Sequence, residues 1–413
     1  MAWPAHRSTP QSWSSTARGP REDRMFTQFE ASLPPKIAGL EWIAPADSAG
    51  LLERAAVELA RLDVVAGQIL SPLSSFLLRN EAQSSSKIER VFTSQDELAK
   101  AALGLKSSAG ATETLAAAEA IEDLIASSST GNPASAPALN SAHHRLMRHD
   151  LLDAKHAGAW RTMQNWIGGS DHSPRGAVHV PPPAEDVADY MADLEAFVAR
   201  SDLPALAQAA LAHAQFESIH PYTDGNGRIG RALINAILRK RGITVSTIVP
   251  VASAFAAKRE WYFALVNEYR TGDVDLFVDF LAASALLAAS EALVSADRLR
   301  QLPEVWTAAA PSRAGSAAST LVGSLLAHPL VTAESAARIA GVSDLAARTA
   351  ISTLERAGVL RSISDRKRDR AWAAGDVLDE AESLVGRIAE QPQRLLTPRV
   401  ETFLKTQGLL ATS

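Results

Sequence analysis

The sequence predicts a mainly helical protein, with a large helical region followed by a small appended domain near the C-terminus. Apolar residues recur at intervals of three and four over long stretches, such as 51–70 and 184–200. Runs of β-forming residues are few and short, and no repeat of solenoid length occurs. Residues 308–319 are small or polar and have no apolar period, which is typical of a linker between two parts.

Composition excludes several classes of protein. The chain has 413 residues, 46% of them hydrophobic and 21% charged, which is ordinary for a globular protein of two or three domains. A net charge of -5 argues against general binding to nucleic acid or to acidic membranes. The absence of cysteine excludes disulfides, thiol catalysis and cysteine-bound zinc, and it favours a cytoplasmic location. The most apolar run, 275–290, is short and carries two early acids, so we expect a buried helix.

The predicted elements follow in order along the chain. Residues 1–34 are rich in Arg, Ser and Pro, and we expect a disordered tail without a signal peptide. Residues 158–183 differ from their helical surroundings, because their Gly, Pro, Trp and Val content favours a loop with a short β-hairpin. The expected boundaries are an N-terminal helical region at 35–110, a core at 111–307, the linker at 308–319, an appended domain at 320–390 and a tail at 391–413.

The stretch HPYTDGNGRIGR, residues 220–231, concentrates polar and glycine residues between two helical patterns. It contains the spacing Gly-x-Gly-x-x-Gly of a dinucleotide-binding turn. That turn needs a strand before the glycines, whereas residues 205–219 have helical periodicity. The carboxylates of an EF-hand are also missing. What remains is a Gly-Asn-Gly turn that opens a helix.

Such a turn can bind phosphate. Backbone N–H groups at a helix N-terminus form an anion site, and Gly225 and Gly227 let phosphate approach the backbone closely. Asn226 adds a side-chain donor. Arg228 and Arg231 lie three residues apart on one helix face, where both can donate to a polyphosphate.

Two further residues suggest chemistry beside that phosphate. Asp224 precedes the turn and is placed to hold Mg²⁺ against the same phosphates. His220 can be a neutral general base at pH 7. The alternative is a capped turn between helices with a buried histidine and surface arginines, which would account for any one of these residues alone.

The whole stretch resembles the signature of Fic-domain proteins, His-Pro-Phe-x-Asp/Glu-Gly-Asn-Gly-Arg-x-x-Arg, with Tyr222 in place of the Phe. The resemblance covers roughly residues 35–300 and implies a Fic-type helical core that transfers AMP from ATP to a Ser, Thr or Tyr hydroxyl of a target protein, or of the chain itself. It implies that His220 deprotonates the hydroxyl, that Asp224 holds Mg²⁺, and that Arg231 binds the γ-phosphate. The α- and β-phosphates would be held by Gly225, Asn226, Gly227 and Arg228, of which Asn226 and Arg228 are also catalytic.

A second stretch, NEAQSSSKIERV at 80–91, resembles the N-terminal inhibitory helix of Fic proteins, with the pattern Ser/Thr-x-x-x-Glu-Gly/Asn. Ser85 and Glu89 would lie one turn apart on one face. The resemblance implies that Glu89 pairs with Arg231 and takes the place of the γ-phosphate. Arg90 stands where the family has Gly or Asn, and we expect it to pair with Glu89 and loosen the inhibition. An ordinary solvated helix face is the alternative.

Further resemblances are weaker. RGAVHVPPP at 175–183 resembles the family's flap, whose edge, with Val178, His179 and Val180, would align a target segment by strand addition. A structural hairpin packed on the core is the alternative. Tyr262 is the candidate for stacking on adenine, with a core position as the alternative. We expect His213 to make a structural hydrogen bond, and Arg161 and Trp166 to be scaffold.

The C-terminal segment resembles a winged helix-turn-helix, with a turn at Gly341, a wing at SDRKRDRAW, and Arg348, Thr349 and Ser352 facing a DNA groove. A protein-binding or dimerising module is the alternative. The leading prediction is thus a self-inhibited protein adenylyltransferase that uses ATP and Mg²⁺. The alternatives are an enzyme that removes AMP at the same site, and a DNA-binding regulator whose core senses a nucleotide. No membrane partner is expected, and a homo-oligomer is one possibility.

Overall fold

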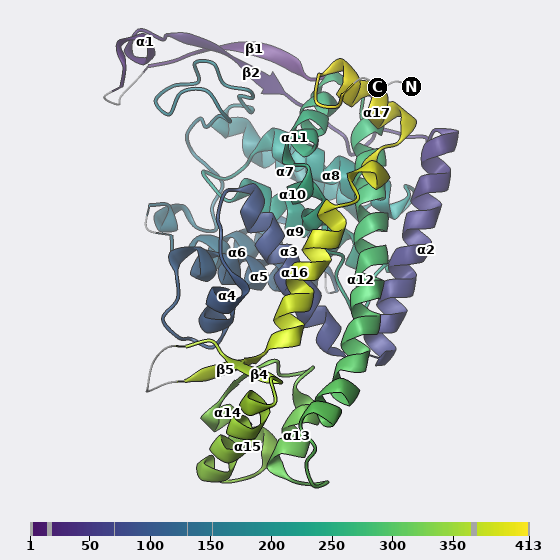
Figure 1. Ribbon diagram of the computed structural model, residues 1–413. Helices are drawn as coiled ribbons and strands as arrows, with labels where there is room; N and C mark the ends of the chain where they lie inside the picture. Colours follow the sequence, from purple (N-terminus) through teal and green to yellow (C-terminus); the bar gives the residue numbers. More distant parts are fainter. Residues whose placement is uncertain are drawn as a thin grey trace.

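A computed structural model describes residues 3–14, 19–69, 71–129, 131–150, 152–364 and 370–411. The fold is mainly helical, as the sequence predicts, with a body of packed helices and a smaller group of helices and short strands at one end (Figure 1). The helices of the body are α2 (Ala46–Ile69), α3 (Ser71–Ile88), α4 (Gln95–Ala102), α5 (Ala109–Ser128), α6 (Ala136–Met147), α7 (Val187–Ala199), α8 (Ala205–Ile219), α9 (Asn226–Lys240), α10 (Val251–Ala257), α11 (Arg259–Glu268) and α12 (Asp275–Ala309). Short 3-10 turns occur at Ala154–His156, Ala184–Asp186, Tyr269–Thr271 and Pro392–Leu395.

Helices α8 and α9 form the centre of the body, and the loop between them carries the signature. Every residue of α8 from Leu206 to Ile219 is buried, because α7, α9 and α12 all pack against it. A helix buried on all sides has no solvent-facing surface, so it depends on the elements packed around it. The ends of the loop that joins α8 to α9 are therefore fixed by two core helices.

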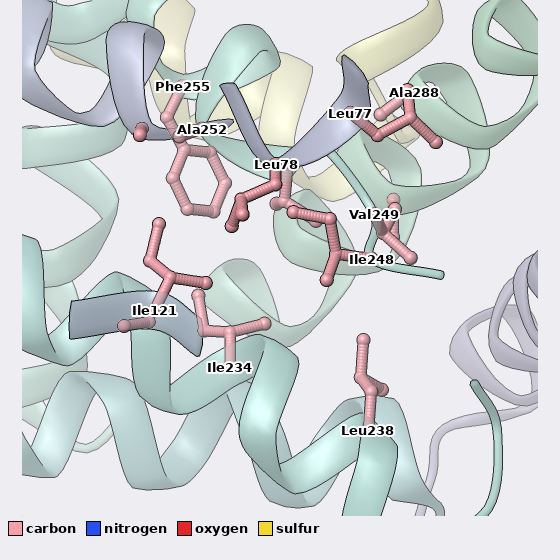
Figure 2. Close-up of a cluster of buried hydrophobic side chains, with 14 of the residues drawn as sticks. Leu77, Leu78, Ile121, Ile234, Leu238, Ile248, Val249, Ala252, Phe255 and Ala288 are labelled. Carbon is pink, nitrogen blue, oxygen red and sulfur yellow. The ribbon is translucent and has the colours of Figure 1, made fainter. Parts of the chain in front are cut away.

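Helix α3 carries the predicted inhibitory motif at its C-terminal end and is anchored in the same core. Its Leu77 and Leu78 lie among side chains of α5, α9, α10 and α12 (Figure 2). Leu77 and Ile88 are fully buried, so apolar contacts hold both the middle and the end of α3. Burial of one such side chain contributes about 1.5–3 kcal/mol. The position of the motif is therefore set by packing and not only by its polar contacts.

The N-terminal residues form an ordered arm, which corrects the prediction of a disordered tail at 1–34. Strands β1 (Arg7–Ser12) and β2 (Gln28–Leu33) pair antiparallel, and α1 (Arg21–Arg24) lies between them. Trp3 is buried against Tyr269, and Ala31 is also buried. The arm could not be recognised from the sequence, because its anchors are single aromatic and apolar side chains with no periodic pattern.

The apolar run at 275–290 lies in α12. By length and composition α12 could cross a membrane, yet 78% of its most apolar window is buried inside the protein. Helix α2 lies along it and α16 (Gly375–Ala389) packs against its other side (Figure 1). The prediction of a buried helix is confirmed for this run.

The smaller part contains α13 (Ala317–Ser324), β3 (Leu330–Thr332), α14 (Ala333–Ala340), α15 (Asp344–Arg356), β4 (Leu360–Ser362) and β5 (Ala371–Ala374). The three strands form one antiparallel sheet in the order β3-β5-β4, with Val331 opposite Trp372 and Ser362 opposite the same residue. Gly341 ends α14 and α15 follows it, so the predicted turn between two helices is present. Part of the predicted wing, residues 365–369, lies outside the described residues.

Two boundaries differ from the predictions. Helix α12 continues to Ala309, so the irregular connection to α13 is shorter than the predicted linker. The chain after β5 returns to the body through α16 and ends in α17 (Pro398–Thr406), where the expected tail was. Val400 and Leu404 are fully buried, and the carbonyl of Leu409 accepts a hydrogen bond from Trp261 Nε1 at 3.2 Å.

Candidate active site

The signature loop begins with a left-handed residue at the end of α8. His220 has φ 49° and ψ 62°, and its N–H donates to the carbonyl of Phe216 at 2.8 Å. A left-handed conformation costs a non-glycine residue about 1–2 kcal/mol, so the surrounding structure must hold it. The chain then turns through Gly225, which is the N-cap of α9.

Asn226 closes this turn from inside. Its Oδ1 accepts a hydrogen bond from the N–H of Tyr222, and its Nδ2 donates to the carbonyl of the same residue, both at 2.8 Å. The side chain is buried and both polar atoms are used. This corrects the expectation that Asn226 donates to phosphate through its side chain. Asn226 can contribute to an anion site in two other ways: it holds the loop in position, and its own backbone N–H lies at the start of α9.

Arg161 and His143 support the loop from other parts of the chain. The guanidinium of Arg161 is buried and donates to the carbonyls of His220 (2.9 Å), Pro182 (2.6 Å) and Met163 (3.2 Å). The ring of His143 stacks on Tyr222, with centroids 3.6 Å apart. The scaffold role expected for Arg161 agrees with these contacts. His143 could not be identified from the sequence, because its partners are distant in the chain.

His143 also fixes the backbone of Asp224. Its Nδ1 accepts from the N–H of Gly158 at 2.9 Å, so the neutral ring must donate from Nε2 to the carbonyl of Asp224, 3.0 Å away. Burial lowers the pKa of His143 to about 4, which keeps this ring neutral near pH 7. The backbone on both sides of the glycine turn is thereby held by side chains.

His220 itself is neutral at physiological pH. Its side chain is largely buried, and burial, together with the charges of Arg161 and Arg270, lowers its pKa to about 3. Within the described part of the chain its Nδ1 makes no hydrogen bond, and Glu217 Oε2 lies 3.9 Å from it. A neutral imidazole can accept a proton, as the sequence analysis expects for a general base.

Glu217 is a residue that the sequence analysis missed. It is buried beneath His220, and burial raises its pKa to about 7, although Arg231 opposes the shift. A methyl group on Gly230 would lie 2.6 Å from Glu217 Oε1 and 3.0 Å from Phe216 Cδ1. The absence of a side chain at Gly230 therefore lets α9 approach the buried carboxyl of Glu217 on α8.

The two predicted partners of the inhibitory motif contact Arg231. Its Nη2 donates to Glu89 Oε1 at 2.7 Å and to the carbonyl of Ser85 at 3.0 Å, and its Nε donates to Ser85 Oγ at 2.8 Å. Burial opposes the charge of Arg231, but the Glu89 carboxylate raises its pKa above the ordinary value. In turn, the charges of Arg231 and Arg228 outweigh burial and hold the pKa of Glu89 below its ordinary value.

The Glu89 carboxylate lies directly over the glycine turn. A methyl group built on Gly227 would overlap Glu89 Oε1 and would lie 2.9 Å from Arg231 Nη1. The first N–H groups of an α-helix have no partner within the helix and attract anions. Glu89 is thus an internal anion at the place where the sequence analysis expects phosphate.

Arg90 has a different role from the expected one. The end of α3 has the hydrogen bonds of a Schellman motif, from the N–H of Val91 to the carbonyl of Ser86 and from the N–H of Arg90 to that of Lys87, both at 3.0 Å. Arg90 has φ 62°, the left-handed position of that motif, which explains why Gly or Asn suits it. Glu89 pairs with Arg231 and not with Arg90. The expectation of a local Arg90–Glu89 pair is therefore wrong.

Arg228 and Asp224 lie at the mouth of the site. Arg228 Nη2 is 3.6 Å from Asp224 Oδ2, and its other contact is with Met147 Sδ at 3.8 Å. The Asp224 side chain is 55% exposed, while that of Arg228 is buried. No cluster of three or more acidic or histidine side chains suited to a metal occurs among the described residues. The protein thus offers one accessible carboxylate, which fits a Mg²⁺ ion carried by nucleotide phosphates, since Mg²⁺ usually takes one or two protein carboxylates.

The predicted flap is a short hairpin beside this loop. Ile167 and His179 form an isolated antiparallel bridge, with Ile167 N–H donating to the His179 carbonyl at 2.8 Å. Only Val178 of the three expected docking residues has an exposed side chain, at 64%. His179 points inward, where its Nε2 lies 2.9 Å from the Ser218 carbonyl, and Val180 is buried. The side chains of His179 and Val180 are therefore structural, which corrects their assignment to target docking.

Tyr262 is not available to stack on a base. It is fully buried, stacks on Phe255 with centroids 4.7 Å apart, and its hydroxyl lies 2.9 Å from His213 Nε2. The alternative of a core position is correct for Tyr262. The structural hydrogen bond expected for His213 is present, and its partner lies on α11.

Comparison with known proteins agrees with this geometry. Residues 134–238 match the Fic/DOC family, and residues 49–124 match the Fic/DOC family N-terminal region. The chain is 34% identical over 143 residues to a protein adenylyltransferase Fic of Nematostella vectensis and 33% identical over 143 residues to one of Drosophila virilis. The matched segment is 34% of this chain but only 30% and 26% of those relatives.

A solved structure shares the fold over a longer stretch. The crystal structure of a Fic family protein from Desulfovibrio desulfuricans G20 superposes with a TM-score of 0.55 and 21% identity. The superposition covers 81% of this chain and 97% of the other. The likeness therefore extends beyond the signature loop to most of the helical body.

Proposed function

Because this chain carries a Fic domain preceded by the family's N-terminal region, we propose that it is a self-inhibited protein adenylyltransferase. It would transfer AMP from ATP to a Ser, Thr or Tyr hydroxyl of a target protein, and it can include itself among its targets. Relatives named protein adenylyltransferase are 33–34% identical to it over 143 residues. The observation that carries the proposal is the convergence of a neutral His220, a glycine turn and Arg231 around a single internal carboxylate.

The proposed step needs a base and an anion site. The neutral imidazole of His220 accepts the proton of the target hydroxyl, whose oxygen forms a bond to the α-phosphorus of ATP. The bond from that phosphorus to the oxygen bridging to the β-phosphate breaks, and pyrophosphate leaves. Phosphates bound at the N-terminus of α9 place negative charge beside His220, which raises its pKa from about 3 and makes it a better base. Arg228 and the first N–H groups of α9 hold the phosphates.

Magnesium would be held by Asp224 together with the nucleotide. The ion would neutralise charge on the phosphates. Asp224 would exchange its contact with Arg228, at 3.6 Å, for the metal, and the freed guanidinium could donate to a phosphate oxygen instead.

Self-inhibition would follow from competition for Arg231. Glu89 uses the same guanidinium that a γ-phosphate needs, and its carboxylate covers Gly227. A charge-assisted hydrogen bond contributes about 1.5–3 kcal/mol, so removal of Glu89 should raise activity on the order of ten- to a hundredfold. We keep the cytoplasm as the proposed location, on the composition alone.

The test is transfer of label from ATP labelled at the α-phosphate by the Glu89→Gly variant, with purified protein alone and with a cell lysate. We expect label on the protein itself or on a lysate protein. The label should fall by about 10²–10⁴-fold when His220→Ala is added, because a general base is lost. Glu53→Gln, a change of an exposed acid on α2, is the matched control and should behave like wild type.

If Glu89→Gly binds ATP yet labels nothing, adenylyl transfer is not the function. The DNA-binding regulator then becomes the leading alternative, because Arg348, Thr349 and Ser352 lie on the exposed face of α15. Release of AMP from a modified protein by wild type, lost in Glu89→Gly, would instead favour the enzyme that removes AMP, with Glu89 positioning water.

A further inference from the structure

The C-terminal end of the inhibitory helix α3 is held by side chains from two other helices. The last four carbonyl groups of an α-helix have no partner within the helix, and in α3 they belong to residues 85–88. Those of Ser86 and Lys87 accept hydrogen bonds from backbone N–H groups of the Schellman motif, at 3.0 Å. Those of Ser85 and Ile88 are bound by arginine side chains of α9 and α11. Two long cations thus complete the end of the inhibitory helix.

The two cations differ in what ATP would do to them. Arg231 Nη2 donates to the Ser85 carbonyl at 3.0 Å, and in the proposed function the γ-phosphate of ATP needs the same guanidinium. The other cation is Arg259, the first residue of α11, whose Nε donates to the Ile88 carbonyl at 2.7 Å. The γ-phosphate does not need Arg259 in the proposed function. Arg259 therefore stays bound to the end of α3 while phosphate competes for Arg231.

Arg259 is also placed to fix the backbone of Glu89. The Ile88 carbonyl belongs to the planar peptide unit that ends at the Cα of Glu89, so this bond restrains the point from which the carboxylate extends. The side chain of Arg259 is half-buried, and its Cζ lies 4.7 Å from the centroid of the Phe263 ring, one turn further along α11. A cation at the C-terminus of a helix is favoured by the helix dipole as well. Arg259 is thus held by α11 and in turn holds the last carbonyl of α3.

The bond to Ile88 ends a row of polar contacts along α3. Glu81, Ser84 and Ile88 are spaced by three and four residues, which places them on one face of the helix. Glu81 Oε2 accepts from the N–H of Ala252 at 2.8 Å, and Ser84 Oγ lies 2.9 Å from Ser253 Oγ. Both of these partners are in α10, so three polar contacts attach α3 to α10 and α11. The contact made by α11 lies nearest in the chain to the carboxylate that covers the glycine turn.

We propose that Arg259 is a positioning residue for self-inhibition: by holding the Ile88 carbonyl, it keeps Glu89 over the glycine turn and against Arg231. The inference rests on the proposed function, because it concerns how strongly that site is inhibited. Phosphate can displace Glu89 only if the end of α3 moves or the Glu89 side chain turns away. Arg259 opposes the first of these movements, so its loss should ease the displacement without removing the carboxylate.

The test is a cycle of ATP affinities, measured by titration calorimetry on the full chain with Mg²⁺ present. Arg259→Met keeps an apolar stem against Phe263 and removes the donor. We expect it to bind ATP about three- to tenfold more tightly than wild type, because a charge-assisted hydrogen bond that opposes displacement of Glu89 is lost. In the Glu89→Gly background the same substitution should leave ATP affinity unchanged, because no carboxylate remains to be positioned.

Two further variants control for charge and for folding. Lys258 precedes Arg259, and its ammonium makes the same kind of contact, 5.0 Å from the centroid of the Trp261 ring. Lys258→Met should therefore bind ATP like wild type. Arg259→Lys keeps a cation that can donate to a carbonyl, so its ATP affinity should lie between those of wild type and Arg259→Met. If Arg259→Met does not fold, Arg259→Lys carries the same comparison.

Hydrogen exchange tests the same contact without nucleotide. The N–H groups of Arg90 and Val91 donate in the Schellman motif, so their exchange reports how firmly the end of α3 is held. We expect faster exchange of both groups in Arg259→Met and no change in Lys258→Met.

Unchanged ATP affinity or unchanged exchange in Arg259→Met would overturn the inference. An equal change of affinity in the wild-type and Glu89→Gly backgrounds would also overturn it, because Arg259 would then act on the nucleotide and not through Glu89. The proposed function fails by a different result, which is binding of ATP by Glu89→Gly without transfer of label. Affinity and exchange are measured without transfer, so they decide the role of Arg259 in either case.

Discussion

The nucleotide side and the target side of the candidate site are built very differently. On the nucleotide side, the loop from His220 to Arg231 joins two core helices and is mostly buried. Side chains of α3, of α6 and of the segment after α6 hold its backbone or its arginines. On the target side, one bridge between Ile167 and His179 joins the two strands of the flap. The N-terminal arm bonds to the flap through Ser32. Many buried contacts therefore hold the residues of the nucleotide side in place. Only a few backbone and surface contacts hold the flap.

Arg161 connects the two sides. It donates to the carbonyl of His220 on the nucleotide side and to that of Pro182 at the base of the flap. We expect Arg161→Met to have the largest effect, about 3 kcal/mol or more of lost stability, because three carbonyls in partly or fully buried hydrogen bonds lose this donor. Urea unfolding measures this loss.

Arg161→Lys is the control for charge. It keeps the cation but loses the planar fork, so its loss should lie between wild type and Arg161→Met. If Arg161→Met unfolds at the same urea concentration as wild type, the loop and the flap are held independently of Arg161.

Glu217 tests the nucleotide side through pH. Its pKa of about 7 in the folded protein lies above the ordinary 4.5, so its contribution to stability is complete below pH 4.5 and is lost as pH rises through 7. Glu217→Gln stays neutral throughout. Relative to that variant, wild type should lose on the order of 3 kcal/mol between pH 4.5 and 7.5.

The measurement is urea unfolding of both proteins at several pH values. Glu334→Gln, on the exposed face of α14, should run parallel to wild type. A constant difference between wild type and Glu217→Gln at all pH values would mean that Glu217 is ionised in the folded protein, and that the site carries one more negative charge than we infer.

The nucleotide side and the target side also differ in how much of each could be predicted from the sequence. The contact of Ser85 and Glu89 with Arg231 is predicted correctly, because each motif is local in the sequence. Glu217 and His143 escape prediction, since burial and stacking depend on helices that meet only in the fold. On the target side Val178 is exposed as expected, but alternation along a strand could not show that His179 turns inward to α8.

Elements without periodicity were the hardest to predict. The N-terminal arm is held by Trp3, by Trp13 packed edge-on against Trp166 at 5.4 Å, and by Asp23, none of which forms a pattern. Tyr262 was misplaced for the opposite reason, because an aromatic residue at helical spacing suits both a core and a binding pocket.

Arg90 gives a smaller test at the edge of the nucleotide side. A glycine removes the cost of its left-handed conformation, so Arg90→Gly should stabilise the end of α3 by about 0.5–1 kcal/mol. The Glu89–Arg231 pair would then be held more firmly, and ATP affinity and basal transfer should fall a few-fold. Arg90→Asn should act in the same direction and more weakly. Higher basal transfer by Arg90→Gly would show that Arg90 supports the inhibitory contact instead of straining it.

The smallest expected change in stability concerns the arm on the target side. The N–H of Ser32 in β2 donates to the carbonyl of Val180 at 2.8 Å. Because His179 pairs with Ile167, the backbone of Val180 faces the other edge of the flap, so the arm occupies the edge to which a target strand could add. Asp23 fastens the arm through Ser173 Oγ at 2.5 Å and Arg175 Nε at 3.3 Å.

Asp23→Ala should therefore release the arm without disturbing α8 and α9. We expect faster proteolysis within residues 19–34, little change in the global unfolding midpoint, and unchanged ATP affinity in the Glu89→Gly background. Transfer to a protein target in that background should rise, because the flap edge becomes free, whereas Glu30→Ala on the exposed side of β2 should change none of these. An altered ATP affinity in Asp23→Ala would mean that the arm also acts on the nucleotide side, and the division between the two sides would fail.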